Sequence, residues 1–223
     1  MTLVYERLRD VAAETDRILD VGTKTGKNLT NVAGEVVAID VDIDPAADVE
    51  YVVADGRRIP FDDDAFDYVV SAQVLEHVAG KDAFINEIER VLRPGGRFLV
   101  AFPNRLLPLD PHSLPPFFPW LPKRLVLRYF DLVGDENQYE YVQDHCFYLT
   151  SIRGRRLLER HFESVTYGTL DYSMAYSYIF QSDLGRAYKR ALPVIDRIVS
   201  GLPFGERLYE LAFRHTAYEC TLE

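Results

Sequence analysis

The sequence predicts an α/β fold with a mainly parallel sheet. Five short runs rich in apolar residues occur between residues 18 and 102, and helical patterns or turns separate them. Apolar residues occupy both faces of these runs, as in strands that a parallel sheet buries on both sides. Strands that alternate with helices indicate an α/β fold. The expected strands are 18–21, 35–40, 51–54, 66–71 and 97–102.

The length predicts a single domain over residues 1–223. A chain of this size buries about 70% of its unfolded surface, so it needs neither a metal ion nor disulfides to fold. The hydrophobic fraction of 48% and the aromatic fraction of 13% suit a globular protein with a full core.

Charge and cysteine content argue against several classes of function. The net charge of −10 disfavours broad contact with nucleic-acid phosphates, so we expect no nucleic-acid partner. Cys146 and Cys220 lie far apart with no metal-ligand spacing, which indicates a reduced, cytoplasmic protein without a metal site. The N-terminus lacks the apolar core of a signal peptide. No window has the roughly 18 uncharged apolar residues of a membrane span.

The first strand ends in an unusual turn. A loose helical pattern over 3–15 leads into the run 18–21, which contains Asp20 and is followed by Gly22 and Gly26. Glycines let the backbone turn sharply and approach a ligand closely. A buried acid costs free energy unless something pairs with it, so Asp20 indicates a ligand with an ammonium or hydroxyl group. The alternative is a strand-end aspartate that caps the next helix.

The second strand also ends in an acid. A short helix over 27–32 precedes the strand 35–40, and Asp40 follows Gly22 by 18 residues. An acid at about this spacing binds ribose hydroxyls in Rossmann-like units. The alternative is a solvated turn residue, because further aspartates follow at 42, 44 and 48.

The next elements complete the first half of the chain. The third strand ends at Asp55-Gly56, and the fourth follows the acidic loop 62–64. Residues 82–92 form an amphipathic helix with Asp82 as its expected cap, and 94–96 (Pro-Gly-Gly) stop it before the fifth strand. The later part is expected to contain a helix around 123–130, a sixth strand at 163–171, helices at 184–200 and 204–213, and a last strand at 215–221.

Six motifs occur in order along the first half of the chain. They are Ile18-Leu19-Asp20-Val21-Gly22, Ala38-Ile39-Asp40, Ala54-Asp55-Gly56 with Ile59-Pro60-Phe61, Phe66-Asp67-Tyr68-Val69-Val70, Val74-Leu75-Glu76-His77-Val78 and Arg90-Val91-Leu92-Arg93-Pro94-Gly95-Gly96. In these motifs the chain resembles the class I S-adenosylmethionine-dependent methyltransferases, specifically the small single-domain group called type 11. The match covers residues 15–103 closely and resumes loosely at 145–170.

The resemblance implies a Rossmann-like fold with seven strands, an antiparallel last strand and helices on both faces. It also implies a cofactor-binding half at 1–103 and a substrate-side half at 104–223. The cofactor is then S-adenosylmethionine and the product S-adenosylhomocysteine. Asp20 and the backbone around Gly22, Thr23 and Gly26 would hold its methionine part.

The adenosine part would bind at the following strands. The resemblance implies that Asp40 takes the ribose hydroxyls and that Val41 lies against the adenine. Asp55 would accept the adenine amino group, with the Gly56 amide beside it. Ser71 to Gln73 would line the floor near the methionine end.

One residue departs from the family pattern. The family usually has a glycine midway between Gly22 and Gly26, where this chain has Lys24. The Lys24 side chain either crowds the cofactor or points to solvent. The other fold considered, a dinucleotide dehydrogenase, requires G-x-G-x-x-G, which residues 22–26 lack.

A segment over 103–122 holds seven of the twelve prolines and is expected to form a lid over the carboxyl edge of the sheet. Together with Lys123, Arg124 and Arg128 it indicates an apolar mouth with a basic rim, suited to a lipid-like or anionic substrate; the acceptor is expected to be a small molecule or lipid-like. The alternatives are ordinary packing against the core and shallow contact with a membrane surface. The aromatic residues over 167–180 are interpreted either as a second wall of this pocket or as core.

Methyl transfer to oxygen or carbon needs a base within hydrogen-bond reach. The candidates are His77, His112 and His145. We therefore predict an S-adenosylmethionine-dependent methyltransferase, with a non-catalytic cofactor-binding or interaction protein as the alternative. The aromatic residues of the last third make a homodimer conceivable.

Overall fold

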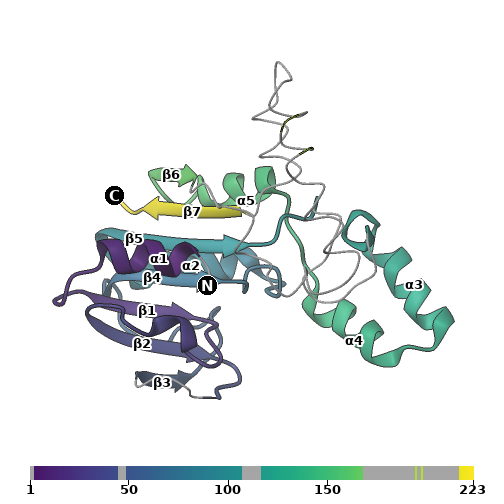
Figure 1. Cartoon of the computed structure of the whole chain (residues 1–223), viewed down its shortest axis with the longest axis horizontal. Coiled ribbons are helices and arrows are strands. Elements are labelled where there is room, and N and C mark those ends of the chain that lie inside the picture. The colour runs from purple at the N-terminus through teal and green to yellow at the C-terminus, as the bar shows by residue number, and fades with distance from the viewer. Residues whose placement is uncertain (1–2, 45–48, 107–116, 168–193, 195–196, 198–215) are drawn as a thin grey trace.

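The computed structural model of this protein describes residues 3–44, 49–106, 117–167, 194, 197 and 216–223. A seven-stranded sheet forms its centre, in the order β3-β2-β1-β4-β5-β7-β6 (Figure 1). Its strands are β1 (Arg17–Val21), β2 (Glu35–Asp40), β3 (Glu50–Val53), β4 (Phe66–Ala72), β5 (Leu92–Phe102), β6 (Ser164–Tyr167) and β7 (Thr216–Thr221).

The first five strands run parallel, and β7 runs antiparallel to both β5 and β6. The chain starts in the middle of the sheet at β1, moves outward to β3, and then returns to β4 on the other side of β1. The strand order therefore reverses between β1 and β4. Loops at the carboxyl ends of these two strands diverge there, which leaves a crevice suited to ligands.

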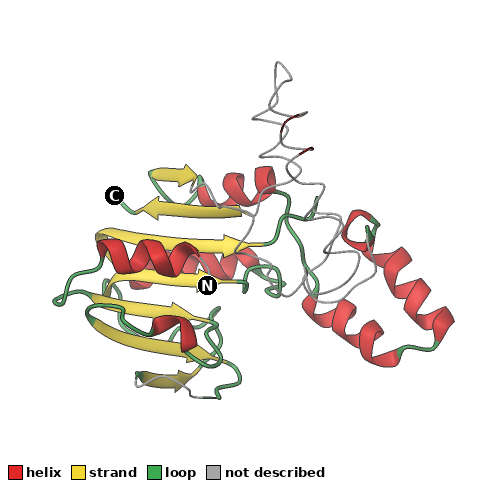
Figure 2. Cartoon of the chain, in the orientation of Figure 1, coloured by secondary structure: helices red, strands yellow, loops and turns green. Residues whose placement is uncertain are grey.

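Helices cover both faces of the sheet (Figure 2). On one face, α1 (Leu3–Val11) packs Val4 and Leu8 into a core with residues of β1, β2, β4 and β5. On the other, α2 (Lys81–Val91) and α5 (Ser151–Leu158) pack against a larger core around Phe66 and Phe98. Burial on both faces explains why the strands lack a polar side.

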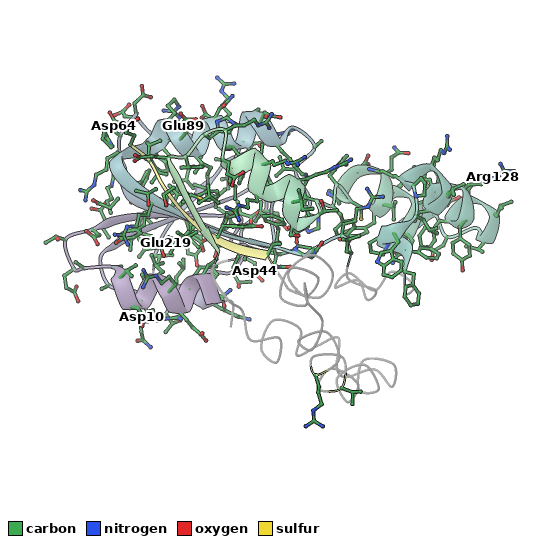
Figure 3. All side chains as sticks on the ribbon, turned by 90° about the horizontal axis from the view of Figure 1, so that it is seen from above. Asp10, Asp44, Asp64, Glu89, Arg128 and Glu219 are labelled. Carbon is green, nitrogen blue, oxygen red and sulfur yellow. The ribbon has the colours of Figure 1, made fainter. Side chains whose placement is uncertain are left out.

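A helical arm extends beyond the carboxyl edge of the sheet (Figure 1). It consists of α3 (Lys123–Val133) and α4 (Glu136–His145), preceded by the 3-10 turn η2 (Phe118–Trp120). Gly134 ends α3 at a φ of 73°, and the Asp135 side chain caps α4 by accepting from the Gln138 amide. A small core of its own holds the arm together, and Arg128 lies at its outer end (Figure 3).

The predicted seven-stranded sheet with an antiparallel last strand is confirmed. Several boundaries differ. The helix expected over 3–15 ends at Val11, because the Asp16 carboxylate accepts from the Ala13 amide and forms a turn. The short helix expected over 27–32 is a single 3-10 turn, η1 (Lys27–Leu29).

The predicted cap of α2 is wrong. Asp82 lies in the first turn of the helix, and the N-cap is Gly80. The Asp82 carboxylate instead accepts from the Arg160 guanidinium at 2.7 Å. The fifth strand begins at Leu92 and includes Gly95 and Gly96, since these pair with the backbone after β7.

Some predictions fall outside the described residues. They are His112, the centre of the expected lid at 107–116, most of the aromatic stretch over 167–180, the helix expected at 184–200 apart from Val194 and Arg197, and the helix expected at 204–213.

A close contact between α5 and β5 tests this packing. A methyl group on Gly154 would overlap the Phe102 ring, so Gly154→Ala must displace a buried side chain. Overpacking of this kind costs about 1–3 kcal/mol, against a gain in helix propensity of about 1 kcal/mol. We expect a net loss of stability in urea unfolding. Arg156→Ala, at an exposed position of the same helix, serves as the control and should be close to neutral.

Candidate functional site

The candidate site lies at the carboxyl edge of the sheet, where β1, β2 and β4 end. Asp20 precedes the last residue of β1, and Asp40 is the last residue of β2. Ser71 is the next-to-last residue of β4. Because β1 is the neighbour of both other strands, the structure brings these three predicted residues to one edge.

Asp20 is completely buried. The Tyr5 hydroxyl of α1 donates to both carboxylate oxygens, at 2.9 and 3.0 Å. Burial raises the pKa of Asp20 to about 7; the nearby Thr23 hydroxyl and the Tyr5 hydrogen bonds oppose the rise, and the nearby Asp40 charge adds to it. Burial and the Asp20 charge also raise the pKa of Tyr5 well above its ordinary value. Asp20 therefore lacks a cation among the groups that shift its pKa, and a cationic ligand would stabilise its ionised form.

Glycine is required at the end of β1. Gly22 has a φ of +84°, and its amide donates to the Ile39 carbonyl at 2.8 Å. A side chain there would overlap Val74, which follows β4. The turn is therefore held against both neighbouring strands, and its backbone can closely approach a ligand.

Lys24 adopts a backbone conformation that favours glycine. Its φ is +50°, in the left-handed region. The Lys24 ammonium lies 3.3 Å from Asp42, and the side chain is 62% exposed. The side chain thus points toward solvent and Asp42, so of the two predicted orientations the structure shows the one that leaves the turn accessible.

Asp40 is held in a fixed orientation. Its carboxylate accepts from the Lys24 amide at 2.7 Å and from the Asp42 amide at 3.2 Å. A carboxylate has about four acceptor sites, so sites for two further donors remain. Val41 beside it is 69% exposed and offers an apolar surface.

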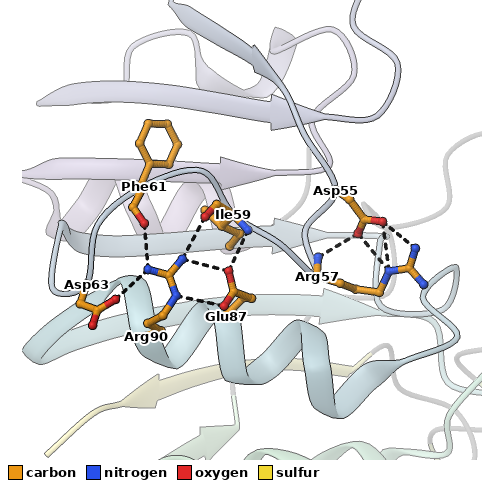
Figure 4. A network of polar contacts seen from close by, with 7 residues as sticks. All are labelled: Asp55, Arg57, Ile59, Phe61, Asp63, Glu87 and Arg90. Atoms are coloured by element: carbon orange, nitrogen blue, oxygen red, sulfur yellow. Dashed lines mark hydrogen bonds and ion pairs between the residues drawn. The ribbon is translucent and has the colours of Figure 1, made fainter.

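Asp55 is engaged by a neighbour that the sequence analysis did not consider. The Arg57 guanidinium and amide donate to its carboxylate at 2.6–3.1 Å (Figure 4). Arg57 thereby lowers the pKa of Asp55. The adjacent Gly56 packs so closely on Phe84 that a side chain there would overlap the ring.

A second ion pair fixes the loop after Asp55. Arg90 of α2 donates to the carbonyls of Ile59 and Phe61, and it pairs with Glu87 and Asp63 (Figure 4). Glu87 in turn accepts from the Ile59 amide at 2.8 Å. These bonds raise the pKa of Arg90 and lower that of Glu87. The pair stabilises the loop that leads away from Asp55.

Ser71 and Gln73 lie where β4 leaves the sheet. Ser71 is completely buried. Gln73 has a φ of +62°, and its amide donates to the Ala101 carbonyl at 2.8 Å. The left-handed turn at Gln73 redirects the chain along the sheet edge toward His77.

Two of the three candidate bases lie together. The Nδ1 of His77 lies 2.8 Å from the His145 carbonyl oxygen, and the two rings are 6.4 Å apart between centroids. Because a carbonyl only accepts, Nδ1 carries a proton in this contact. The other nitrogen, Nε2, lies 4.0 Å from Glu76, which is buried. The Tyr141 ring lies beside both histidines and was not among the predicted residues.

Comparisons with known proteins agree with this arrangement. Residues 19–100 match a family model described as "Methyltransferase domain". A Mycolicibacterium smegmatis protein named "Probable S-adenosylmethionine-dependent methyltransferase" is 38% identical over 114 residues, which cover 47% of this chain and 44% of that protein. The ubiquinone/menaquinone biosynthesis C-methyltransferase UbiE of Pseudomonas putida is 36% identical over 104 residues, or 38% of this chain and 41% of that one. The matched stretch is therefore less than half the length of these curated relatives.

A solved structure shares the fold across most of the chain. The [4+2]-cyclase SpnF has a TM-score of 0.55 and 22% identity, covering 98% of this chain and 78% of that one. The fold therefore also occurs in a protein that is named for a cyclisation rather than for methyl transfer.

In the residues described, no helix is long and apolar enough to cross a membrane, and no group of three or more candidate ligands is placed to hold a metal ion.

The raised pKa of Asp20 makes a specific prediction about stability. Its folded-state value of about 7 lies above the ordinary 3.8, so ionisation of this group destabilises the fold as the pH rises through that range. Asp20→Asn removes the buried charge. We expect the unfolding free energy of the variant, relative to the wild type, to be higher at pH 8 than at pH 5 by roughly 2.5 kcal/mol. Urea unfolding at both pH values measures it.

The matched control is Asp44→Asn, which neutralises an exposed aspartate on the same edge. Its effect should be the same at both pH values. If the change in unfolding free energy caused by Asp20→Asn were also independent of pH, this would contradict a raised pKa of Asp20 in the folded protein.

Proposed function

We propose that this chain, whose residues 19–100 match the methyltransferase family model, is a class I S-adenosylmethionine-dependent methyltransferase that transfers a methyl group to a small-molecule or lipid-like acceptor. The observation that carries the proposal is the completely buried Asp20 carboxylate beside the Gly22 turn, where the strand order reverses. The product would be S-adenosylhomocysteine.

The residues at the end of β1 fit the methionine half of this cofactor. Its ammonium group would pair with Asp20 and supply a cation, which none of the described groups that shift the pKa of this carboxylate provides. The backbone of Gly22, Thr23, Lys24 and Gly26 would surround the rest of the amino-acid part, because positive φ angles at Gly22 and Gly26 expose main-chain atoms there. Ser71 and Gln73 would form the floor.

The adenosine half would bind along β2 and β3. Asp40, oriented by two backbone amides, has acceptor sites left for two ribose hydroxyls. Val41 would pack against the adenine ring. The Gly56 amide would contact the adenine base. Asp55 would accept a hydrogen bond from the adenine amino group only if Arg57 leaves one acceptor site of the carboxylate open.

The cofactor supplies a sulfonium methyl that is already reactive, so this chain's residues mainly align the acceptor and exclude water. Alignment of this kind contributes about 7–11 kcal/mol to lowering a barrier. For a hydroxyl or carbon acceptor, His77 would take the proton at Nε2, since Nδ1 is bound to the His145 carbonyl. The imidazolium would then lie near Glu76, 4.0 Å away. His145 and His112 are the other candidate bases.

A second function is favoured by two observations. Arg57 already occupies Asp55, and a [4+2]-cyclase shares the fold. Fold alone does not determine activity, so the alternative is a protein that binds the cofactor or a partner without transferring a methyl group.

We also propose that residues 1–223 form one methyltransferase domain and that the protein works in the cytoplasm. Cys146 and Cys220 support the second statement, because both are free thiols buried in the structure. Among the described residues, the sheet and its helices share continuous cores, which supports the first.

Calorimetric titration with S-adenosylhomocysteine tests the cofactor assignment. We expect micromolar binding by the wild type and none of NAD. Asp40→Ala removes the two ribose hydrogen bonds, each worth about 1.5–3 kcal/mol, so affinity should fall by at least a hundredfold. The control Asp44→Ala removes an equal charge nearby and should bind like the wild type. Equal losses in both variants, or no binding by the wild type, would refute the assignment.

The pKa of Asp20 predicts how this affinity depends on pH. The ligand's ammonium group favours the ionised carboxylate, whose pKa in the free protein is about 7. Binding should therefore release protons, and affinity should rise with pH through 7. We expect roughly tenfold weaker binding of S-adenosylhomocysteine at pH 6 than at pH 8, measured by calorimetry. A flat profile would show that Asp20 is not the group that meets the ammonium.

A further inference from the structure

A pocket of about 250 Å³ lies where the helical arm meets the sheet edge. Its walls come from η2, α3, α4 and the segment after α4. At about 30 Å³ per water molecule, it has room for roughly eight waters. A compact organic molecule of about ten non-hydrogen atoms is therefore the size of ligand that fits.

The lining combines apolar walls with two cations. Phe118, Val126 and Phe147 contribute apolar surface, and Arg105 and Lys123 contribute positive charge. None of the residues that line the pocket is acidic. Ligand pockets typically pair such apolar walls with a few polar groups that fix orientation.

Both cations are positioned by the pocket's own framework. Arg105 donates through Nε to the Pro119 carbonyl at 2.7 Å and through Nη2 to the Leu121 carbonyl at 3.1 Å. Lys123 donates to the Gln143 carbonyl at 2.7 Å, and its ammonium lies 3.8 Å from the centroid of the Phe147 ring.

These bonds leave donors on both side chains. Neither cation forms an ion pair with a carboxylate in the parts of the chain that the structure describes. Burial lowers the pKa of Lys123, while the nearby Cys146 sulfur and Asp144 carboxylate oppose this. A partly buried cation without a bonded counter-ion is costly, so an anionic group is the ligand chemistry that this pocket favours.

The pocket wall is tied to the candidate site. The Phe147 amide donates to the Glu76 carbonyl at 2.7 Å, and the His145 carbonyl contacts His77. The segment that carries Glu76 and His77 begins at Val74, which packs on the Gly22 turn. A ligand in the pocket would therefore lie along the same edge of the sheet as the methionine half of the cofactor.

We propose that this pocket binds the acceptor through a carboxylate attached to a compact apolar body, with Arg105 and Lys123 holding the carboxylate. The role of the ligand as methyl acceptor rests on the proposed methyltransferase function, whereas binding of a carboxylate in the pocket does not depend on it. The overall charge of −10 would disfavour anions elsewhere on the protein, so this pocket would be a selective site.

The test uses 4-fluorobenzoate, whose ten non-hydrogen atoms match the pocket, and its neutral analogue 4-fluorobenzyl alcohol. Fluorine NMR titration measures both dissociation constants without any cofactor. We expect the wild type to bind the acid at least tenfold more tightly than the alcohol. Lys123→Met should weaken binding of the acid roughly 10-fold to 100-fold, as loss of a charge-assisted hydrogen bond does. The affinity for the alcohol should be unchanged.

Two matched variants complete the experiment. Arg124→Met removes the same charge from the next residue of α3, which does not line the pocket, and should bind the acid like the wild type. Lys123→Arg keeps the charge and should restore most of the affinity. Equal binding of acid and alcohol, equal losses at Lys123 and Arg124, or no binding of the acid at millimolar concentration would overturn the proposal.

The cofactor titration of the same variants separates the two proposals. If S-adenosylhomocysteine binds but the acid does not, only the acceptor pocket is wrong. If the acid binds through Lys123 and S-adenosylhomocysteine does not, the pocket stands as a carboxylate site and the methyltransferase assignment fails.

Discussion

The buried Asp20 carboxylate is the constraint on which the site depends. A charge in the middle of a parallel sheet destabilises the fold, and among the described residues the groups that offset this cost, the Tyr5 and Thr23 hydroxyls, are uncharged. The α1 helix is part of the arrangement because it supplies Tyr5. Binding of a cation beside Asp20 would stabilise the ionised carboxylate. The free energy that its burial costs in the unliganded protein would then be recovered on binding and would add to the affinity for the ligand.

The sheet could be predicted from sequence because the buried strands are short apolar runs separated by turns or helical patterns; the first is followed by Gly22 and the second ends at Asp40. Asp20 and Asp40 could be assigned to one edge for the same reason, since the carboxyl ends of parallel strands meet there. Boundaries set by side-chain contacts could not be predicted. α1 ends early because the Asp16 carboxylate accepts a hydrogen bond from the Ala13 amide. Asp82 pairs with Arg160, which is distant in the sequence, instead of capping α2.

The substrate side depends on contacts between distant segments. Sequence indicated a basic, apolar region around Lys123, but the pocket exists because Arg105 binds the carbonyls of Pro119 and Leu121, and Phe147 packs against Lys123. Likewise Arg57 occupies Asp55, although the resemblance implies an adenine contact there. Pairings of this kind leave no periodic pattern in the sequence, so they can be found only in the structure.

The pKa of Asp20, measured by carbon-13 NMR of its carboxyl group, tests the central claim most directly. The account predicts a value near 7 in the free protein. Saturation with S-adenosylhomocysteine should lower the pKa of Asp20 by about 1–3 pH units, because an ammonium group within a few ångströms favours the ionised form. A pKa that stays near 7 while the ligand binds would contradict the claim that Asp20 receives the cofactor's ammonium group.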